Sequence, residues 1–123
     1  MRRFLGSFTL LIIMLSILSC STAWVNIYAS LPDLNNIQDG IYRGEYSLPR
    51  TPLKVVLDVT VQNHILTAID IVEHNSSPIG RRAENIVNKI IERQSLDIDV
   101  ISGATASSKT IKMAIQNALE PQN

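Results

Sequence analysis

Residues 99–108 read Asp-Val-Ile-Ser-Gly-Ala-Thr-Ala-Ser-Ser. Three small residues in a row, Ser102, Gly103 and Ala104, let a bulky group approach the backbone closely. The apolar spacing that follows predicts a helix beginning near Thr105, and the first amides of a helix have no partner within it. Such a helix start favours anions. Thr105 can either cap the helix through its hydroxyl or carry a group on that hydroxyl.

This stretch resembles the signature of a known family. Asp99 to Thr105 is similar to the Asp-x-x-Ser-Gly-Ala-Thr pattern of the FMN-binding domain, found in subunits of the sodium-pumping NADH:quinone oxidoreductase, in Rnf complexes and in small extracytoplasmic flavoproteins. The resemblance implies FMN held covalently as a phosphoester of Thr105, attached by a dedicated flavin transferase that uses FAD as donor. It extends weakly over 39–45 and 73–80, and implies an FMN-binding domain over residues 39–119.

The predicted helix start and the resemblance to the FMN-binding domain together predict where the cofactor binds. Asp99 is placed to help deprotonate the acceptor hydroxyl or to bind a metal of the transferase, or else to shape the loop as an Asx turn. Lys109, four residues after Thr105, is placed to neutralise a phosphodiester. The predicted cofactor-binding residues are Asp99, Ser102, Gly103, Ala104, Thr105, Ser107, Ser108 and Lys109.

Alternating apolar residues predict the strands. Residues 41–46 form a strand with Tyr42, Gly44 and Tyr46 on one face, where Gly44 either opens a slot for a flat ring or marks a glycine bulge. Residues 53–73 form a hairpin that turns at Asn63 and His64. The apolar face of this hairpin is predicted to hold Leu53, Val55, Leu57, Val59, Val61, Ile65, Ile69 and Ile71.

Two amphipathic helices follow. Ser77 is a candidate N-cap with Pro78 at the first helical position. The apolar residues after them recur at the helical spacing, in the sets Ala83, Ile86, Val87, Ile90, Ile91 and Ile111, Ala114, Ile115, Ala118, Leu119. The fold class predicted is α+β: an antiparallel sheet of three or more strands with two helices packed on one face, preceded by an N-terminal hydrophobic helix.

Arg81 and Arg82 fall in the first turn of the first of these helices, where the helix dipole disfavours cations. They are either solvated surface charges or groups that face the FMN phosphate or a redox partner. The related family often has Glu-Thr-Pro-Gly near the flavin in this loop, whereas residues 76–79 here read Ser-Ser-Pro-Ile.

The N-terminus indicates export. Arg2 and Arg3 precede an uncharged run from Phe4 to Pro32, which predicts a signal peptide or a membrane span. Because arginines are retained on the cytoplasmic face, the domain is expected on the extracytoplasmic side. We divide the chain into an anchor or signal peptide at 1–28, a linker at 29–38 and the domain.

Two kinds of anchor remain open. Residues 17–20 read Ile-Leu-Ser-Cys, which approximates a lipobox and makes Cys20 a candidate lipid anchor of a lipoprotein. Trp24 and Tyr28 instead suit the interfacial end of an uncleaved span. Cys20 is the only cysteine, so an intramolecular disulfide is excluded.

Composition narrows the function further. Eleven basic and eleven acidic residues give no net charge, which does not indicate a nucleic-acid partner. The sequence shows no catalytic triad and no metal-ligand spacing. We therefore expect a membrane-anchored extracytoplasmic flavoprotein that transfers electrons to or from a membrane redox partner, as a carrier and not an independent enzyme. The alternatives are an anchored binding or structural lipoprotein without flavin and a reductase module that acts with another subunit.

Overall fold

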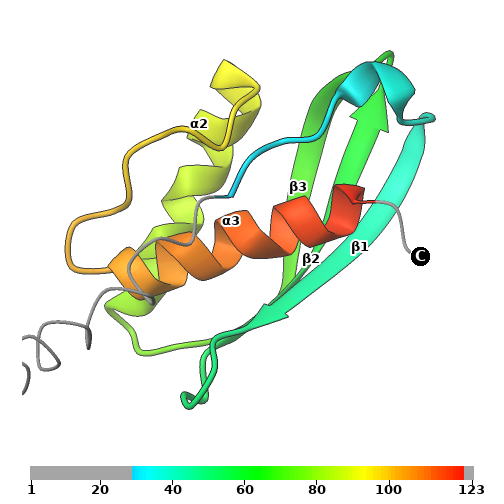
Figure 1. Cartoon of the computed structure of the whole chain (residues 1–123). Coiled ribbons are helices and arrows are strands. Elements are labelled where there is room, and N and C mark those ends of the chain that lie inside the picture. The colour runs from blue at the N-terminus through cyan, green and yellow to red at the C-terminus, as the bar shows by residue number, and fades with distance from the viewer. Residues whose placement is uncertain (1–28, 121–123) are drawn as a thin grey trace, which may run out of the picture.

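The computed structural model describes residues 29–120. Its helices pack on one face of an antiparallel sheet whose strand order is β1-β2-β3 (Figure 1). The elements in chain order are the 3₁₀ helix η2 (Leu34–Asn36), β1 (Gly40–Ser47), β2 (Lys54–Gln62), β3 (Ile65–Asn75), the 3₁₀ helix η3 (Gly80–Asn85), α2 (Ile86–Arg93) and α3 (Thr105–Leu119). The predicted α+β class, with three strands and two helices, is confirmed. The predicted N-terminal hydrophobic helix and Cys20 lie outside the described residues.

Strand β2 forms the centre of the sheet, and its alternation agrees with the prediction. Val55, Leu57, Val59 and Val61 are fully buried, since their side chains leave the strand on the face that the helices cover. Asn63 and His64 connect β2 to β3 with φ angles of 51° and 64°, the left-handed pair of a two-residue type I′ turn.

Strand β3 departs from simple alternation. Its pairing with β2 shifts between Thr60 and Val61 and again between Val56 and Leu57, so β3 carries an extra residue at each shift. Leu66, 1% exposed, therefore faces the core, whereas Ile65 is 50% exposed. The prediction that Ile65 lies on the apolar face is wrong because a bulge after Leu66 changes the phase of the strand.

Strand β1 packs under α3 at Gly44. The pairing of β1 with β2 runs without a register shift, so Gly44 is not a bulge glycine. A Cβ added to Gly44 would lie 2.0 Å from the Ala114 carbonyl oxygen and 2.6 Å from the Ala118 Cβ. The slot expected there for a flat ring is thus filled by the backbone of α3.

The segment after β3 enters its helix more gradually than predicted. Ser77 Oγ accepts the Gly80 amide at 3.1 Å, and the chain continues as the 3₁₀ helix η3 before α2 begins at Ile86. Pro78 lies in a turn ahead of η3. The two predicted apolar faces are confirmed: Ala83, Ile86, Val87 and Ile90 are buried, as are Ile111, Ala114, Ile115, Ala118 and Leu119.

Residues 29–38, predicted as a linker, lie against the domain. Leu31, Leu34 and Ile37 pack on the core, and the Ser30 amide donates to Gln116 Oε1 of α3 at 3.1 Å. Between residues 29 and 120, no helix has both the length and the apolar character that crossing a bilayer requires.

Candidate flavin site

Thr105 is the first residue of α3. The residue before it, Ala104, is the N-cap and supplies no side-chain cap, so the amides of the first turn have no capping side chain. Thr105 itself is exposed, and among the described residues no hydrogen bond of its hydroxyl is found. The interpretation of Thr105 as a capping residue therefore has no support in this geometry.

A tight turn leads into the helix. The Ala104 amide donates to the Ile101 carbonyl at 2.9 Å, and Gly103 has a φ of 79°, which suits the third residue of a type II turn. A Cβ added to Gly103 would meet only the Ile79 Cγ2, at 3.8 Å. Glycine is thus required there by its backbone angle and not by crowding, and Ser102 and Gly103 remain exposed.

Side chains of α3 hold this loop from behind. Ser108 is fully buried; its Oγ accepts the Ile101 amide at 3.1 Å and donates to the Ala104 carbonyl at 2.8 Å. One turn later, the Lys112 ammonium donates to the Ile98 carbonyl. The two side chains fix the path of the loop up to Thr105.

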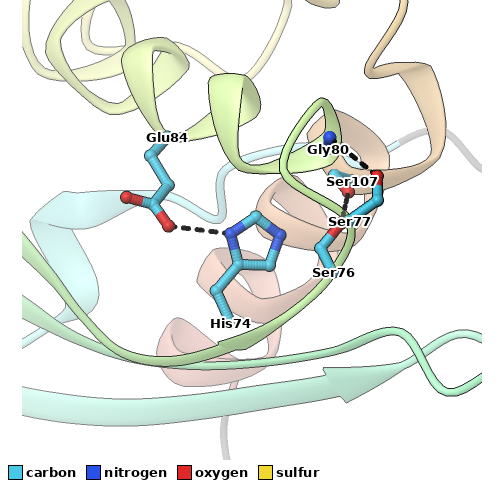
Figure 2. Close-up of polar contacts among 6 residues, drawn as sticks. All are labelled: His74, Ser76, Ser77, Gly80, Glu84 and Ser107. Atoms are coloured by element: carbon cyan, nitrogen blue, oxygen red, sulfur yellow. Dashed lines mark hydrogen bonds and ion pairs between the residues drawn. The ribbon is translucent and has the colours of Figure 1, made fainter.

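A hydrogen bond between two serine hydroxyls holds the other side of the helix start. Ser107 Oγ and Ser76 Oγ lie 2.8 Å apart, so a hydroxyl of α3 meets the hydroxyl of the residue that follows β3 (Figure 2). A Cβ on Gly80 would lie 1.9 Å from the Ser76 Oγ and 2.7 Å from the Ser107 Oγ. Only glycine therefore fits at position 80 without disturbing this pair of hydroxyls. Nearby, His74 Nδ1 lies 2.9 Å from Glu84 Oε1.

The side of α3 that bears Thr105 lines a pocket. This pocket has a volume of about 220 Å³ and is bounded by Tyr46, Leu48, Thr105, Ala106, Lys109, Thr110 and Met113. Tyr46 and Leu48 come from the end of β1 and the loop after it, and the others from the first turns of α3. Most of these side chains are apolar or aromatic, so the pocket suits a flat apolar group attached beside it.

Several charged groups lie near the Lys112 ammonium, which holds the loop. Burial lowers the pKa of Lys112; the nearby Asp97 and Asp99 carboxylates oppose this effect, and Lys109 adds to it. Asp99 is exposed. Within residues 29–120, no cluster of three or more His, Cys, Asp or Glu side chains is able to hold a metal ion.

Residues 51–120 match the FMN-binding domain. The chain belongs to the FMN-binding domain family. This stretch includes β2, β3, both α helices and the loop that ends at Thr105, and it supports FMN as the cofactor of a flavin-binding protein. No curated protein matches the chain.

The described residues fit such a group. The uncapped amides at the start of α3 suit a phosphate, the exposed Gly103 leaves room beside it, and the apolar pocket suits a ring. Of the predicted site residues, Ser102, Gly103 and Thr105 are exposed at the helix start, and Lys109 lines the pocket. The hydroxyls of Ser107 and Ser108 instead bond to protein groups. The Ser108 amide also donates to the Ala104 carbonyl at 2.9 Å, so of these two residues only Ser107 offers a first-turn amide.

Sequence reasoning did not predict Ser76, Lys112 or Met113 for this site, and it placed Tyr46 only beside the slot considered at Gly44. The i, i+4 series formed by Ser108 and Lys112, and by Thr105, Lys109 and Met113, was a usable signal, since such residues share one face of a helix. Ser76 had no comparable signal, because its partner lies 31 residues away.

Proposed function

We propose that this protein carries FMN covalently on the Thr105 hydroxyl and transfers electrons through it. The observation that carries the proposal is the exposed hydroxyl at the uncapped N-terminus of α3, beside an apolar pocket, in a chain of the FMN-binding domain family. Flavin supplies one- or two-electron chemistry when bound. The chain supplies attachment, orientation and electrostatics.

Each part of the site has a role in this proposal. The Thr105 oxygen forms the bond to phosphorus while a transferase holds the FAD donor, AMP leaves, and the hydroxyl proton passes to a base for which the exposed Asp99 is available. The first-turn amides of α3 and the Lys109 ammonium then stabilise the phosphodiester charge. Tyr46, Leu48 and Met113, which line the pocket, would offer the ring an apolar contact.

The location of the domain belongs to the same proposal. The arginines and the uncharged run of residues 1–28 support a signal peptide or anchor that keeps the domain on the extracytoplasmic side of a membrane. A membrane redox partner then exchanges electrons with the flavin.

Intact mass spectrometry tests the attachment. The full chain is produced with and without a co-expressed flavin transferase, together with Thr105→Ala and, as a control for loss of an exposed threonine, Thr67→Ala. We expect a gain equal to FMN less one water in the native chain and in Thr67→Ala, and no gain in Thr105→Ala. A native chain that gains nothing from an active transferase would overturn the proposal.

Visible spectroscopy tests the electron transfer. The loaded protein is expected to lose its oxidised flavin absorbance on addition of dithionite and to recover it with ferricyanide over repeated cycles. A bound flavin that does not cycle would leave the attachment standing and remove the carrier function.

A further inference from the structure

Three segments distant in sequence meet at the end of the domain that bears Thr105. We call this the acceptor end and define it as residues 48–53, 76–82 and 100–110. Leu48 shares the pocket with Thr105, and the Ile79 side chain faces Gly103. A hollow of about 420 Å³ between the first two segments is lined by Pro52, Leu53, Asn75, Ser76, Ser77 and Arg81. In Figure 1 the segments 76–82 and 100–104 lie beside the start of α3, and the loop between β1 and β2 lies below them at the same end of the domain.

The acceptor end carries positive charge only. Its ionisable residues are Arg50, Arg81, Arg82 and Lys109, and none of the eleven acidic residues of the chain falls in its three segments. The three arginines are exposed, and among residues 29–120 no ion pair involves them. These charges are therefore presented to solvent.

Two flanking carboxylates reduce this positive charge without removing it, since four cations and two anions leave a net charge of +2. Glu84 follows Arg82 by two residues, and its carboxylate contacts His74 Nδ1 at 2.9 Å. Asp99 precedes the third segment, and its charge acts on the Lys112 ammonium. The remaining nine acidic residues belong to other parts of the chain, so the acceptor end keeps a positive charge.

An apolar residue is exposed within this positive surface. Ile79 is 57% exposed and lies beside Gly103, next to the turn that leads to Thr105. Protein interfaces commonly combine an apolar centre with a polar and charged rim. A cluster of like charges steers an oppositely charged partner and raises association rates by about 10 to 10³.

We propose that the acceptor end is the docking surface for an acidic redox partner protein, with Arg50, Arg81 and Arg82 as the steering charges and Ile79 as the apolar contact. This inference rests on the proposed function, because the partner exchanges electrons with the group on Thr105. Charge complementarity selects an acidic protein over a basic one. The positive surface surrounds the acceptor, so the docked partner meets the flavin directly.

The surface is tested first without flavin. A hexa-aspartate peptide is titrated into the ¹⁵N-labelled full chain carrying Thr105→Ala, with hexa-lysine as the reference peptide. Amide shifts are expected to concentrate in the acceptor end, to weaken with salt as charges are screened, and to disappear in R81E/R82E. The matched variant K89E/R93E makes the same change in net charge on α2, where both side chains are exposed, and should leave the shifts in place.

The loaded protein gives the second readout. Stopped-flow oxidation of the reduced flavin is followed with anionic ferricyanide and with cationic tris(phenanthroline)cobalt(III), from about 10 mM to about 0.5 M ionic strength. The ferricyanide rate constant should fall about tenfold or more with salt and the cobalt rate constant should rise. R81E/R82E, or R50E if that variant fails to fold, should reverse or flatten both trends, whereas K89E/R93E should not.

The outcomes separate the two proposals. A chain that never gains flavin ends the proposed function, yet the peptide titration still reports on the surface. Shifts centred on α2, or equal effects of R81E/R82E and K89E/R93E, would mean that net charge alone governs association and would overturn the docking surface.

Discussion

Gly44 sets how closely α3 approaches the sheet. An added methyl group would overlap the Ala114 carbonyl at 2.0 Å and the Ala118 Cβ at 2.6 Å, and neither atom belongs to a flexible side chain. We expect Gly44→Ala to lower the free energy of unfolding by about 1–3 kcal/mol or more through overpacking. Denaturant unfolding of the two proteins measures this change in the free energy of unfolding.

Gly40 provides the matched control for that substitution. It lies in the same strand, but its added Cβ would meet only the Tyr42 ring, at 3.7 Å or more. Gly40→Ala should therefore change stability little. Equal losses in the two variants would show that the effect comes from glycine in a strand and not from contact with α3.

Ser108 holds the loop that presents Thr105. Ser108→Ala leaves the Ile101 amide without its acceptor and the Ala104 carbonyl without one of its donors, a loss of about 1–3 kcal/mol in unfolding free energy for a buried group. Because the loop is less well held, we also expect slower attachment of FMN in a timed transferase reaction.

Ser47→Ala, at an exposed position of β1, is the control for Ser108→Ala. It should keep both the stability and the attachment rate of the native chain. A Ser108→Ala protein that is as stable and as readily loaded as Ser47→Ala would remove the positioning role.

At the scale of elements, two ion pairs join β1 to β2, and the shorter of them links Arg43 to Asp58. Arg43 Nε donates to Asp58 Oδ1 at 2.7 Å and a second guanidinium nitrogen donates to Oδ2 at 2.8 Å. The hydrogen bond from Arg43 holds the pKa of Asp58 below its ordinary value, and burial opposes the shift. The stability that this pair contributes is present above about pH 4, the ordinary range for aspartate, and is lost as pH falls through the lower folded pKa.

We expect Arg43→Ala to raise the pKa of Asp58 toward its ordinary value in an NMR titration of the carboxyl carbon. The difference in unfolding free energy between Arg43→Ala and the native chain should shrink in acid. Arg93→Ala, on α2, is the control and should leave the titration unchanged. An unaltered Asp58 titration in Arg43→Ala would contradict the role of this pair.

The elements most open to prediction were those with one dominant local signal. The alternation of β2, the asparagine-initiated turn at Asn63 and the apolar stripe of α3 each follow from the chain's own periodicity. The bulges of β3 were not predictable, because a residue is extra only relative to the partner strand with which β3 is paired. Ser77 was expected as the N-cap, and its Oγ does accept the Gly80 amide, but the N-cap of η3 is Ile79. The 3₁₀ form of η3 was not predictable, since Gly80 packs against Ser76 and Ser107.

At the scale of the whole molecule, one part of the site was predictable from the sequence and another part was not. The helix start at Thr105 was readable from a short motif, because its small residues and its helix are adjacent in sequence. The pocket was not, since Tyr46 and Met113 meet only when β1 lies beneath α3. The positive charge of the acceptor end was also hidden, because the zero net charge of the chain combines it with the acidic residues elsewhere.

The measurement that tests the central claim most directly is fragmentation of the tryptic peptide that spans residues 94–109, bounded by Arg93 and Lys109, from chain loaded by an active transferase. It holds Thr105 and every serine of the loop. We predict that fragment ions place FMN less one water on Thr105, with Ser102, Ser107 and Ser108 unmodified. An unmodified peptide, or FMN on one of those serines, would contradict a flavin carried by Thr105.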